Sequence, residues 1–300
     1  MNTKVGFYLK VSYNQPKFGL CPTWDFNAIT FVNLSVFSSN NARQMFINTE
    51  NTLYVTIDSL GELLVWSDGN NTLERHITIN SSNLFGVFAT TNGDIYFANG
   101  LPRRAVNRWS SNGTTSEKVL NVNSRYISLF VDINNTLYCS QDTEHQVIKK
   151  SLEISSNNIT IVTGNGSNGS TSYLLDDPQG IFVDTKFNLY VADYGNDRIQ
   201  FFPSNELNGT TVAGTGAPTT ITLDGPTSII LDGNEYLYIA DSRKHRIVGS
   251  GPNGFWCVVA CRDGQWSPSQ LYTPVDLRFD DYGNMFVLDR FSDRIQKFFF

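Results

Sequence analysis

The sequence predicts an all-β fold, a six-bladed β-propeller whose blades are four-stranded antiparallel sheets. The prediction rests on a repeated phrase, on the spacing of its copies and on one strand-like segment left over near the start of the chain. The phrase is sharpest at residues 178–202, PQGIFVDTKFNLYVADYGNDRIQFF, and returns at 226–250 and 274–298. Each copy has an apolar run, an Asp-led turn, a second apolar run, a polar loop and an Arg-Ile pair. That order predicts strand, tight turn, strand, loop and strand.

The number of blades follows from a marker in the second strand, an apolar residue followed by an aromatic one. The marker occurs at Leu53-Tyr54, Ile95-Tyr96, Leu137-Tyr138, Leu189-Tyr190, Leu237-Tyr238 and Met285-Phe286. The intervals are 42, 42, 52, 48 and 48 residues. A period of this length is typical of propellers rather than of solenoids. Six markers therefore predict six blades.

A fourth, outermost strand follows the third in most copies. It is clear at 158–166, 208–216 and 253–264, and weaker at 73–80 and 116–122. The last copy lacks it, whereas the segment WDFNAITFVN at 24–33 precedes the first copy. We expect 24–33 to pair with 294–299 and close the ring, because closure removes two free sheet edges. The predicted blades are 43–80, 85–122, 126–163, 178–214, 226–261, and 274–300 completed by 24–33.

The chain reads as one domain, because no linker with a shifted composition interrupts the repeats. We assign residues 21–300 to the propeller and expect residues 1–20 to form a surface arm. The sequence has no run of 18 apolar residues, so it predicts no membrane-spanning helix. The N-terminal stretch lacks the apolar core of a signal peptide.

Two features favour an extracellular or secreted glycoprotein, with a cytoplasmic protein as the alternative. The chain has four cysteines, an even number. It also has nine N-x-S/T sequons, which a chain rich in Asn, Ser and Thr also produces by chance. The candidate N-glycosylation sites are Asn33, Asn70, Asn80, Asn112, Asn134, Asn158, Asn165, Asn168 and Asn208.

The net charge of −6 and pI near 5.1 argue against a nucleic-acid-binding surface over the whole protein. Contact with phosphates needs a basic footprint. A local basic patch on one face remains open.

The residues that follow the second strands resemble the NHL repeat. The pattern ADxxNxRIQ after P-x-G-[IV]-x-[VL]-D extends over about 24–300, sharp in blades four to six and degraded in blades one to three. The chain's two ends also look like the expanded NHL-repeat proteins of invertebrates such as rotifers. The resemblance implies a six-bladed propeller that usually serves as a protein- or RNA-binding platform and occasionally as a lyase or lactonase.

An Asp and an Arg recur five residues apart across the loop between the second and third strands. We expect these pairs to close the loop in each blade rather than to form an active site, because an active site is rarely built three times over. Degenerate blades change both positions, to Gln141–Gln146, Asn99–Ala105 and Ile57–Glu62. The three predicted structural pairs are Asp193–Arg198, Asp241–Arg246 and Asp289–Arg294.

Catalytic and cofactor sites are not indicated. None of the three histidines, His76, His145 and His245, falls on a first strand, where a channel metal site would need them. Asp276 is the one acid at a channel-mouth position, and we expect it to be solvated in a water-filled channel. One carboxylate is too few for a calcium site. We therefore assign no catalytic residue, no metal and no cofactor.

The cysteines allow one local disulfide. Cys257 and Cys261 would stand about 13 Å apart in an extended strand, so they can bond only if the chain turns before Cys261. Cys139 lies in a second strand and is expected to be a buried free thiol. The partner of Cys21 stays open.

The best candidate for a binding site is the rim formed by the loops between second and third strands, which carries residue types enriched at binding hot spots. Its candidate residues are Arg103, Arg104, Tyr194, Arg243, Lys244, His245, Arg290 and Phe291. The favoured function is a non-catalytic binding scaffold for an extracellular protein or glycan. One alternative is a cytosolic RNA- or protein-binding face, which for RNA requires the Arg103-Arg104 and Arg243-Lys244-His245 clusters to merge. A metal-dependent lyase or lactonase is the second alternative.

Overall fold

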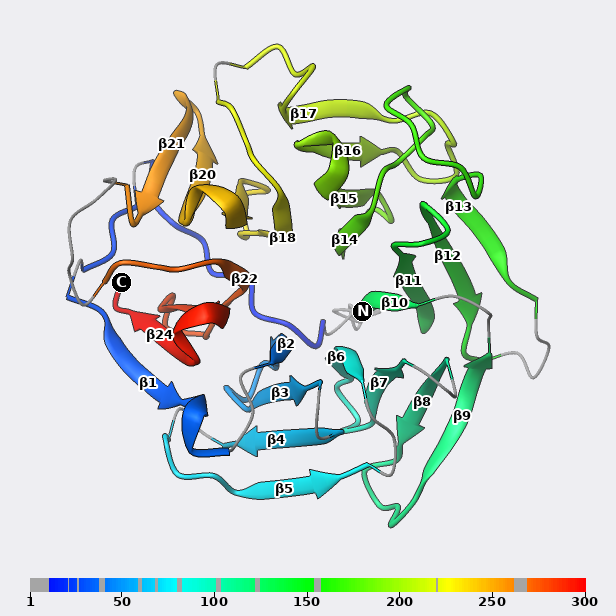
Figure 1. Ribbon diagram of the computed structural model, residues 1–300, viewed down its shortest axis with the longest axis vertical. Helices are drawn as coiled ribbons and strands as arrows, with labels where there is room; N and C mark the ends of the chain where they lie inside the picture. The colour runs from blue at the N-terminus through cyan, green and yellow to red at the C-terminus, as the bar shows by residue number, and fades with distance from the viewer. Residues whose placement is uncertain are drawn as a thin grey trace, which may run out of the picture.

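The protein forms a ring of six four-stranded antiparallel sheets, seen in a computed structural model (Figure 1). The six-bladed propeller predicted from the sequence is therefore confirmed. The structure describes residues 11–20, 22–25, 27–37, 41–58, 61–67, 70–79, 83–100, 104–121, 125–153, 158–219, 221–261 and 269–300.

Each blade has one strand at the channel and three farther out. The inner strands are β2 (Ala42–Ile47), β6 (Leu84–Ala89), β10 (Tyr126–Val131), β14 (Pro178–Val183), β18 (Pro226–Leu231) and β22 (Pro274–Phe279). The second strands are β3 (Leu53–Ile57), β7 (Ile95–Asn99), β11 (Thr136–Gln141), β15 (Leu189–Asp193), β19 (Leu237–Asp241) and β23 (Met285–Asp289). The third strands are β4 (Glu62–Trp66), β8 (Ala105–Trp109), β12 (Gln146–Ser151), β16 (Arg198–Phe202), β20 (Arg246–Gly251) and β24 (Arg294–Phe298). The outer strands are β5 (Arg75–Thr78), β9 (Ser116–Asn121), β13 (Thr160–Gly164), β17 (Thr210–Gly214), β21 (Gly254–Val259) and β1 (Ile29–Asn33).

The ring is closed by the N-terminal strand, as predicted. β1 pairs antiparallel with β24, with Asn33 opposite Arg294 and Ile29 opposite Lys297. Neighbouring inner strands contact one another around the whole ring, including β22 with β2 (Figure 1). The strand is shorter than the predicted 24–33, because it begins only at Ile29. Trp24 instead turns inward and is buried.

Short 3-10 helices occupy the loop between second and third strands in the three blades with the sharpest repeats. They are η2 (Tyr194–Asn196), η3 (Ser242–Lys244) and η4 (Arg290–Ser292); a further one, η1 (Leu34–Phe37), follows β1. Each loop helix ends at a residue in the left-handed conformation, such as Asp197 with φ 54°. These loops share one face of the ring, and the tight turns between first and second strands share the other.

The N-terminal segment is not the surface arm that we expected. Within its described part, Tyr13 and Phe18 are buried. The Tyr13 ring packs against Phe130 and Phe182 at centroid distances of 5.2 and 5.3 Å, and its hydroxyl donates to the Val183 carbonyl. In Figure 1 this blue segment crosses the ring from the centre to the outside. It covers the channel on the face opposite the loop helices.

A second aromatic cluster fixes the end of this segment. Phe18 contacts Trp24, Phe279 and Phe300 at centroid distances of 5.0, 5.0 and 4.8 Å, and the Trp24 indole N–H donates to the Gly283 carbonyl at 2.9 Å. The repeat pattern did not reveal this role, because these N-terminal aromatics lie outside the repeats.

The local disulfide between Cys257 and Cys261 forms, with Cα atoms 5.6 Å apart. The required turn is present: β21 ends at Val259, and Ala260 takes a left-handed φ of 57°. Cys139 is a buried free thiol, and burial raises its pKa well above the usual value. Cys21 lies outside the described residues.

No helix within the described ranges is both long and apolar enough to cross a membrane.

Candidate functional site at the channel mouth

Six equivalent positions close the channel at mid-depth, one from the fifth residue of each inner strand. Four of them are phenylalanines in neighbouring blades, with ring centroids 4.4–5.2 Å apart along the series. The six residues are Phe46, Phe88, Phe130, Phe182, Ile230 and Arg278. Together with Tyr13 they line what little space remains at this depth. The channel is therefore blocked by side chains and is not the water-filled passage that we expected.

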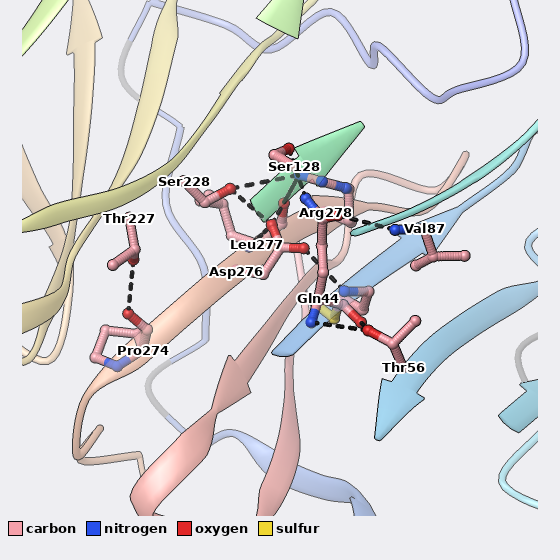
Figure 2. A network of polar contacts seen from close by, with 11 residues as sticks. Gln44, Thr56, Val87, Ser128, Thr227, Ser228, Pro274, Asp276, Leu277 and Arg278 are labelled. Atoms are coloured by element: carbon pink, nitrogen blue, oxygen red, sulfur yellow. Dashed lines mark hydrogen bonds and ion pairs between the residues drawn. The ribbon is translucent and has the colours of Figure 1, made fainter. Parts of the chain in front are cut away.

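A hydrogen-bonded layer, which we call the polar collar, lies above the aromatic layer. It is built from the third residue of the inner strands: Gln44, Ser128, Ser228 and Asp276, with glycines in the other two blades. Figure 2 shows this network from close by. The Gln44 amide donates to the Ser128 hydroxyl at 2.7 Å and accepts from the Val87 N–H at 2.9 Å. Three blades are joined by that one side chain.

Gly86 in blade two leaves room for the Gln44 side chain to reach blade three. Gln44 spans from blade one to blade three across Gly86, where an added Cβ would lie 3.1 Å from the Gln44 oxygen and 2.8 Å from Leu129. The backbone approaches too closely here for any side chain.

Asp276 is buried in the collar, which corrects our expectation that it is solvated. Its carboxylate accepts from the Ser228 hydroxyl at 2.6 Å and from the backbone N–H groups of Met45 and Leu277 at 2.9 Å. It also pairs with Arg278 at 2.9 Å. Burial raises the pKa of Asp276, and Arg278 and the hydrogen bonds oppose that rise. These contacts join blades five, six and one.

An open cavity of about 290 Å³ lies above the collar, on the face of the loop helices. Its wall includes the second residue of every inner strand: Arg43, Phe85, Ile127, Gln179, Thr227 and Val275. Second and third residues both face the channel because all six inner strands have a register shift at this end. Such a bulge breaks the alternation of a regular strand.

Three arginines reach this cavity, and two of them are already paired. Arg43 pairs with Asp58 through its Nε at 2.7 Å, and Arg125 pairs with Asp142. Both guanidinium groups stand over the Phe85 ring, at 5.3 and 5.6 Å from its centroid.

The third arginine, Arg290, comes from η4 and is half-buried. It donates to the Asn41 side-chain oxygen at 3.0 Å. Burial lowers the pKa of Arg290, and the neighbouring charge of Arg43 lowers it further. Across the cavity, burial raises the pKa of Asp177, and the charge of Asp142 adds to that rise. Arg125 lies on the same side of the cavity, and its charge opposes the rise in the pKa of Asp177.

The three Asp–Arg pairs hold the loops that carry this rim. Arg198 Nε lies 2.7 Å from Asp193, and the equivalent distances are 2.8 Å for Arg246–Asp241 and 3.1 Å for Arg294–Asp289. The second oxygen of each Asp accepts a backbone N–H from the preceding interblade loop, at Asp176, Asp224 and Tyr272.

The arginine's remaining donors bind carbonyls of that same loop, as Arg198 does at Ser170, Thr171 and Leu174. Each pair therefore fixes its own loop helix and the connection to the previous blade.

Two of the three degenerate blades make the same kind of contact from different positions. In blade one the acid is Asp58 and the arginine is Arg43, and in blade three they are Asp142 and Arg125. The arginine is moved from the third strand to the entry of the inner strand, which brings it to the cavity. This exchange explains why the sequence pattern alone missed Arg43 and Arg125.

The structure distributes the predicted rim residues over three settings. Tyr194, Arg290 and Phe291 line the cavity. Arg243 lies over the Tyr194 ring at 4.5 Å and pairs with Asp224 at 3.5 Å, so both stand beside the mouth.

The remaining predicted rim residues do not line the cavity. Lys244 donates to Thr222, and Arg104 lies at the entry to β8 in blade two. His245 accepts a hydrogen bond from the Thr273 N–H at 3.1 Å, and His145 makes the equivalent bond to the Asp177 N–H. Arg103 lies outside the described residues.

One aromatic of the rim was not predicted. Tyr272, in the loop before β22, is 58% exposed and lies between His245 and Phe291, with centroid distances of 5.2 and 5.8 Å. Tyr272 lies in an interblade loop, outside the repeated phrase, so the repeat could not place it on the rim. The three rings form a row that begins at the cavity, and Tyr272 and Phe291 in it are exposed.

No three His, Cys, Asp or Glu side chains gather into a metal-binding group in the part of the chain that the structure describes. What the cavity offers is a charged and aromatic wall over a hydroxyl and amide floor.

Comparison with solved structures identifies the class of fold. An auxiliary nutrient binding protein from Bacteroides ovatus has a TM-score of 0.70 at 14% identity, covering 96% of this chain and 75% of its own. A catalytically inactive virginiamycin B lyase from Staphylococcus aureus, with quinupristin, has a TM-score of 0.61 at 15% identity, covering 86% and 80%. A nidogen/laminin complex chain has a TM-score of 0.58 at 14% identity, covering 83% and 92%. At these identities the likeness shows the propeller fold alone.

No family model and no curated protein sequence matches the chain. The NHL-repeat resemblance therefore stays a prediction from its motifs.

Proposed function

We propose that this propeller is a non-catalytic binding scaffold whose partner docks on the face of the loop helices, over the channel mouth. The observation that carries the proposal is the cavity itself, because concave sites with a few converging polar groups are where proteins bind ligands. Tyr194, Arg290 and Phe291 line it, and such residue types dominate binding hot spots. The Bacteroides ovatus neighbour is an auxiliary nutrient binding protein, which is consistent with the use of a propeller fold for binding.

The proposed partner is an extracellular protein or glycan. All eight sequon asparagines in the described ranges are exposed, which glycosylation requires. None of them lines the cavity, so glycans attached there would not fill the cavity itself. The local disulfide fits the same oxidising setting.

The RNA-binding alternative loses its main support. It needed the cluster at Arg104 to merge with that at Arg243, but blades two and five stand on opposite sides of the ring (Figure 1). The lyase alternative is supported only by likeness of fold to the virginiamycin B lyase.

A matched pair of aromatic variants tests the docking face. Phe291, 63% exposed, lies at the cavity, and Tyr282, 74% exposed, lies in the β22–β23 turn on the opposite face. The wild type and both variants are measured against a panel of immobilised glycans and extracellular-matrix proteins. We expect Phe291→Ala to weaken binding of the partner about tenfold or more and Tyr282→Ala to leave it unchanged. Binding that is lost only in Tyr282→Ala contradicts the proposed face.

A further inference from the structure

We propose that the channel-mouth cavity binds the carboxylate-bearing ring of an acidic sugar in a glycan, with Arg290 as the carboxylate ligand. The inference rests on the proposed function, because it names the chemistry of a partner that docks on the same face.

The charges around the cavity favour an anionic ligand at Arg290. Arg290 is the cavity arginine with no carboxylate within ion-pair distance among the described residues, whereas Arg43 and Arg125 each have their own aspartate. Its Nε is buried and has no hydrogen-bond partner within the described part of the chain. Unpaired buried donors are costly to a folded protein. A carboxylate is the group that a planar guanidinium binds through two parallel hydrogen bonds.

Local electrostatics points the same way. The lowered pKa of Arg290 reflects a site that disfavours its positive charge, because Arg43 stands nearby and water is partly excluded. An anion bound beside Arg290 would favour the charged form of this arginine and offset the repulsion from Arg43. On the far side, Asp177 receives a hydrogen bond from the Gln179 amide at 2.6 Å. On this side Arg125 is already paired with Asp142, so Asp177 offers acceptors to hydroxyl groups.

The size of the cavity and the polar groups that line its floor both fit a single sugar ring. At about 290 Å³ the cavity lies at the small end of ligand pockets, which run from about 300 to 1,000 Å³. It has room for one ring and not for a chain of them. Ser128, Gln179 and Thr227 line it, and hydroxyl and amide groups both donate and accept. A sugar ring presents hydroxyls that do the same.

A row of aromatic side chains extends along the rim from the cavity. Phe291, Tyr272 and His245 follow one another along the rim, and the first two are more than half exposed. Exposed aromatic patches mark interaction surfaces, and flat rings offer faces on which further sugars can stack. A peptide that binds by adding a strand would instead need a free sheet edge. The row therefore favours a glycan over an acidic peptide.

Isothermal titration calorimetry with two ring-locked sugars tests the assignment. Methyl β-glucuronide and methyl β-glucoside differ only where the first carries a carboxylate. We expect the wild type to prefer the glucuronide by about tenfold or more, as a hydrogen-bonded charge pair provides. Arg290→Gln should abolish that preference while leaving the glucoside affinity unchanged. Arg75→Gln, which removes an exposed arginine of the outer strand β5 away from the cavity, should keep it.

Equal affinity for the two glycosides, or no measurable binding of the glucuronide, overturns the inference. A third ligand, N-acetyl-glutamate methylamide, carries its carboxylate on a model of a peptide residue instead of a sugar. If it binds as tightly as the glucuronide, the site recognises an acidic peptide and the sugar assignment fails. These failures differ from a failure of the proposed function. In that case Phe291→Ala would leave partner binding intact, whatever the charge preference at Arg290.

Discussion

Asp276→Ala is expected to lower the free energy of unfolding by about 3–5 kcal/mol, the range for breaking a buried ion pair from one side. The substitution leaves Arg278 buried beside the aromatic layer without its carboxylate. It also removes the acceptor for Ser228 and for the Met45 N–H, which tie blade six to both neighbours. Urea unfolding followed by circular dichroism measures the change.

A double variant separates the ion pair from the rest of the network. Asp276→Ala/Arg278→Met removes both charges, so we expect it to lose less stability than the sum of the single variants. A cost below about 1 kcal/mol for Asp276→Ala alone would show that the polar collar does not hold the ring together.

Trp24→Ala is expected to cost about 3–5 kcal/mol, as large-to-small changes at buried aromatic residues do. Trp24 packs against Phe18 and Phe279, and its N–H is bonded to Gly283. Its loss would release the N-terminal segment that covers the channel and leads into the closing strand β1. Thermal unfolding gives the measurement.

Leu20→Ala is the matched control for that variant. Leu20 lies in the same segment but is 72% exposed, so its substitution should change stability by no more than about 0.5 kcal/mol. Equal effects of the two variants would contradict a buried, structural role for the segment.

The sequence predicted the ring because the information is local and repeated. Each marker pair, such as Leu189-Tyr190, and each Asp–Arg pair lies within one blade, so the same signal occurs at a regular period. The closing strand was predictable for a related reason: the last repeat lacked one strand, and 24–33 supplied a matching one.

The N-terminal segment and the collar were not predictable in this way. Tyr13 and Phe18 are single aromatics outside the repeat, and nothing in their neighbourhood indicates burial. Asp276 looked like a solvated residue because its partners lie 48 and 231 positions away, in other blades.

The candidate site was predictable in part. Tyr194, Arg290 and Phe291 follow the repeated Asp directly, so the pattern placed them on the rim. Arg43 and Arg125 take the place of the third-strand arginine, but they come from the entry of the inner strand. They precede their aspartates, Asp58 and Asp142, by 15 and 17 residues. A fixed five-residue spacing could not find them.

Hydrogen–deuterium exchange tests the central claim most directly, because it maps where a partner docks without presupposing which residues matter. The protein is compared alone and with a saturating bound partner from the panel. The account predicts added protection in the loops around η2, η3 and η4, and none in the β22–β23 turn on the opposite face. Protection confined to that turn, or to the N-terminal segment beside it, would contradict a binding site at the channel mouth.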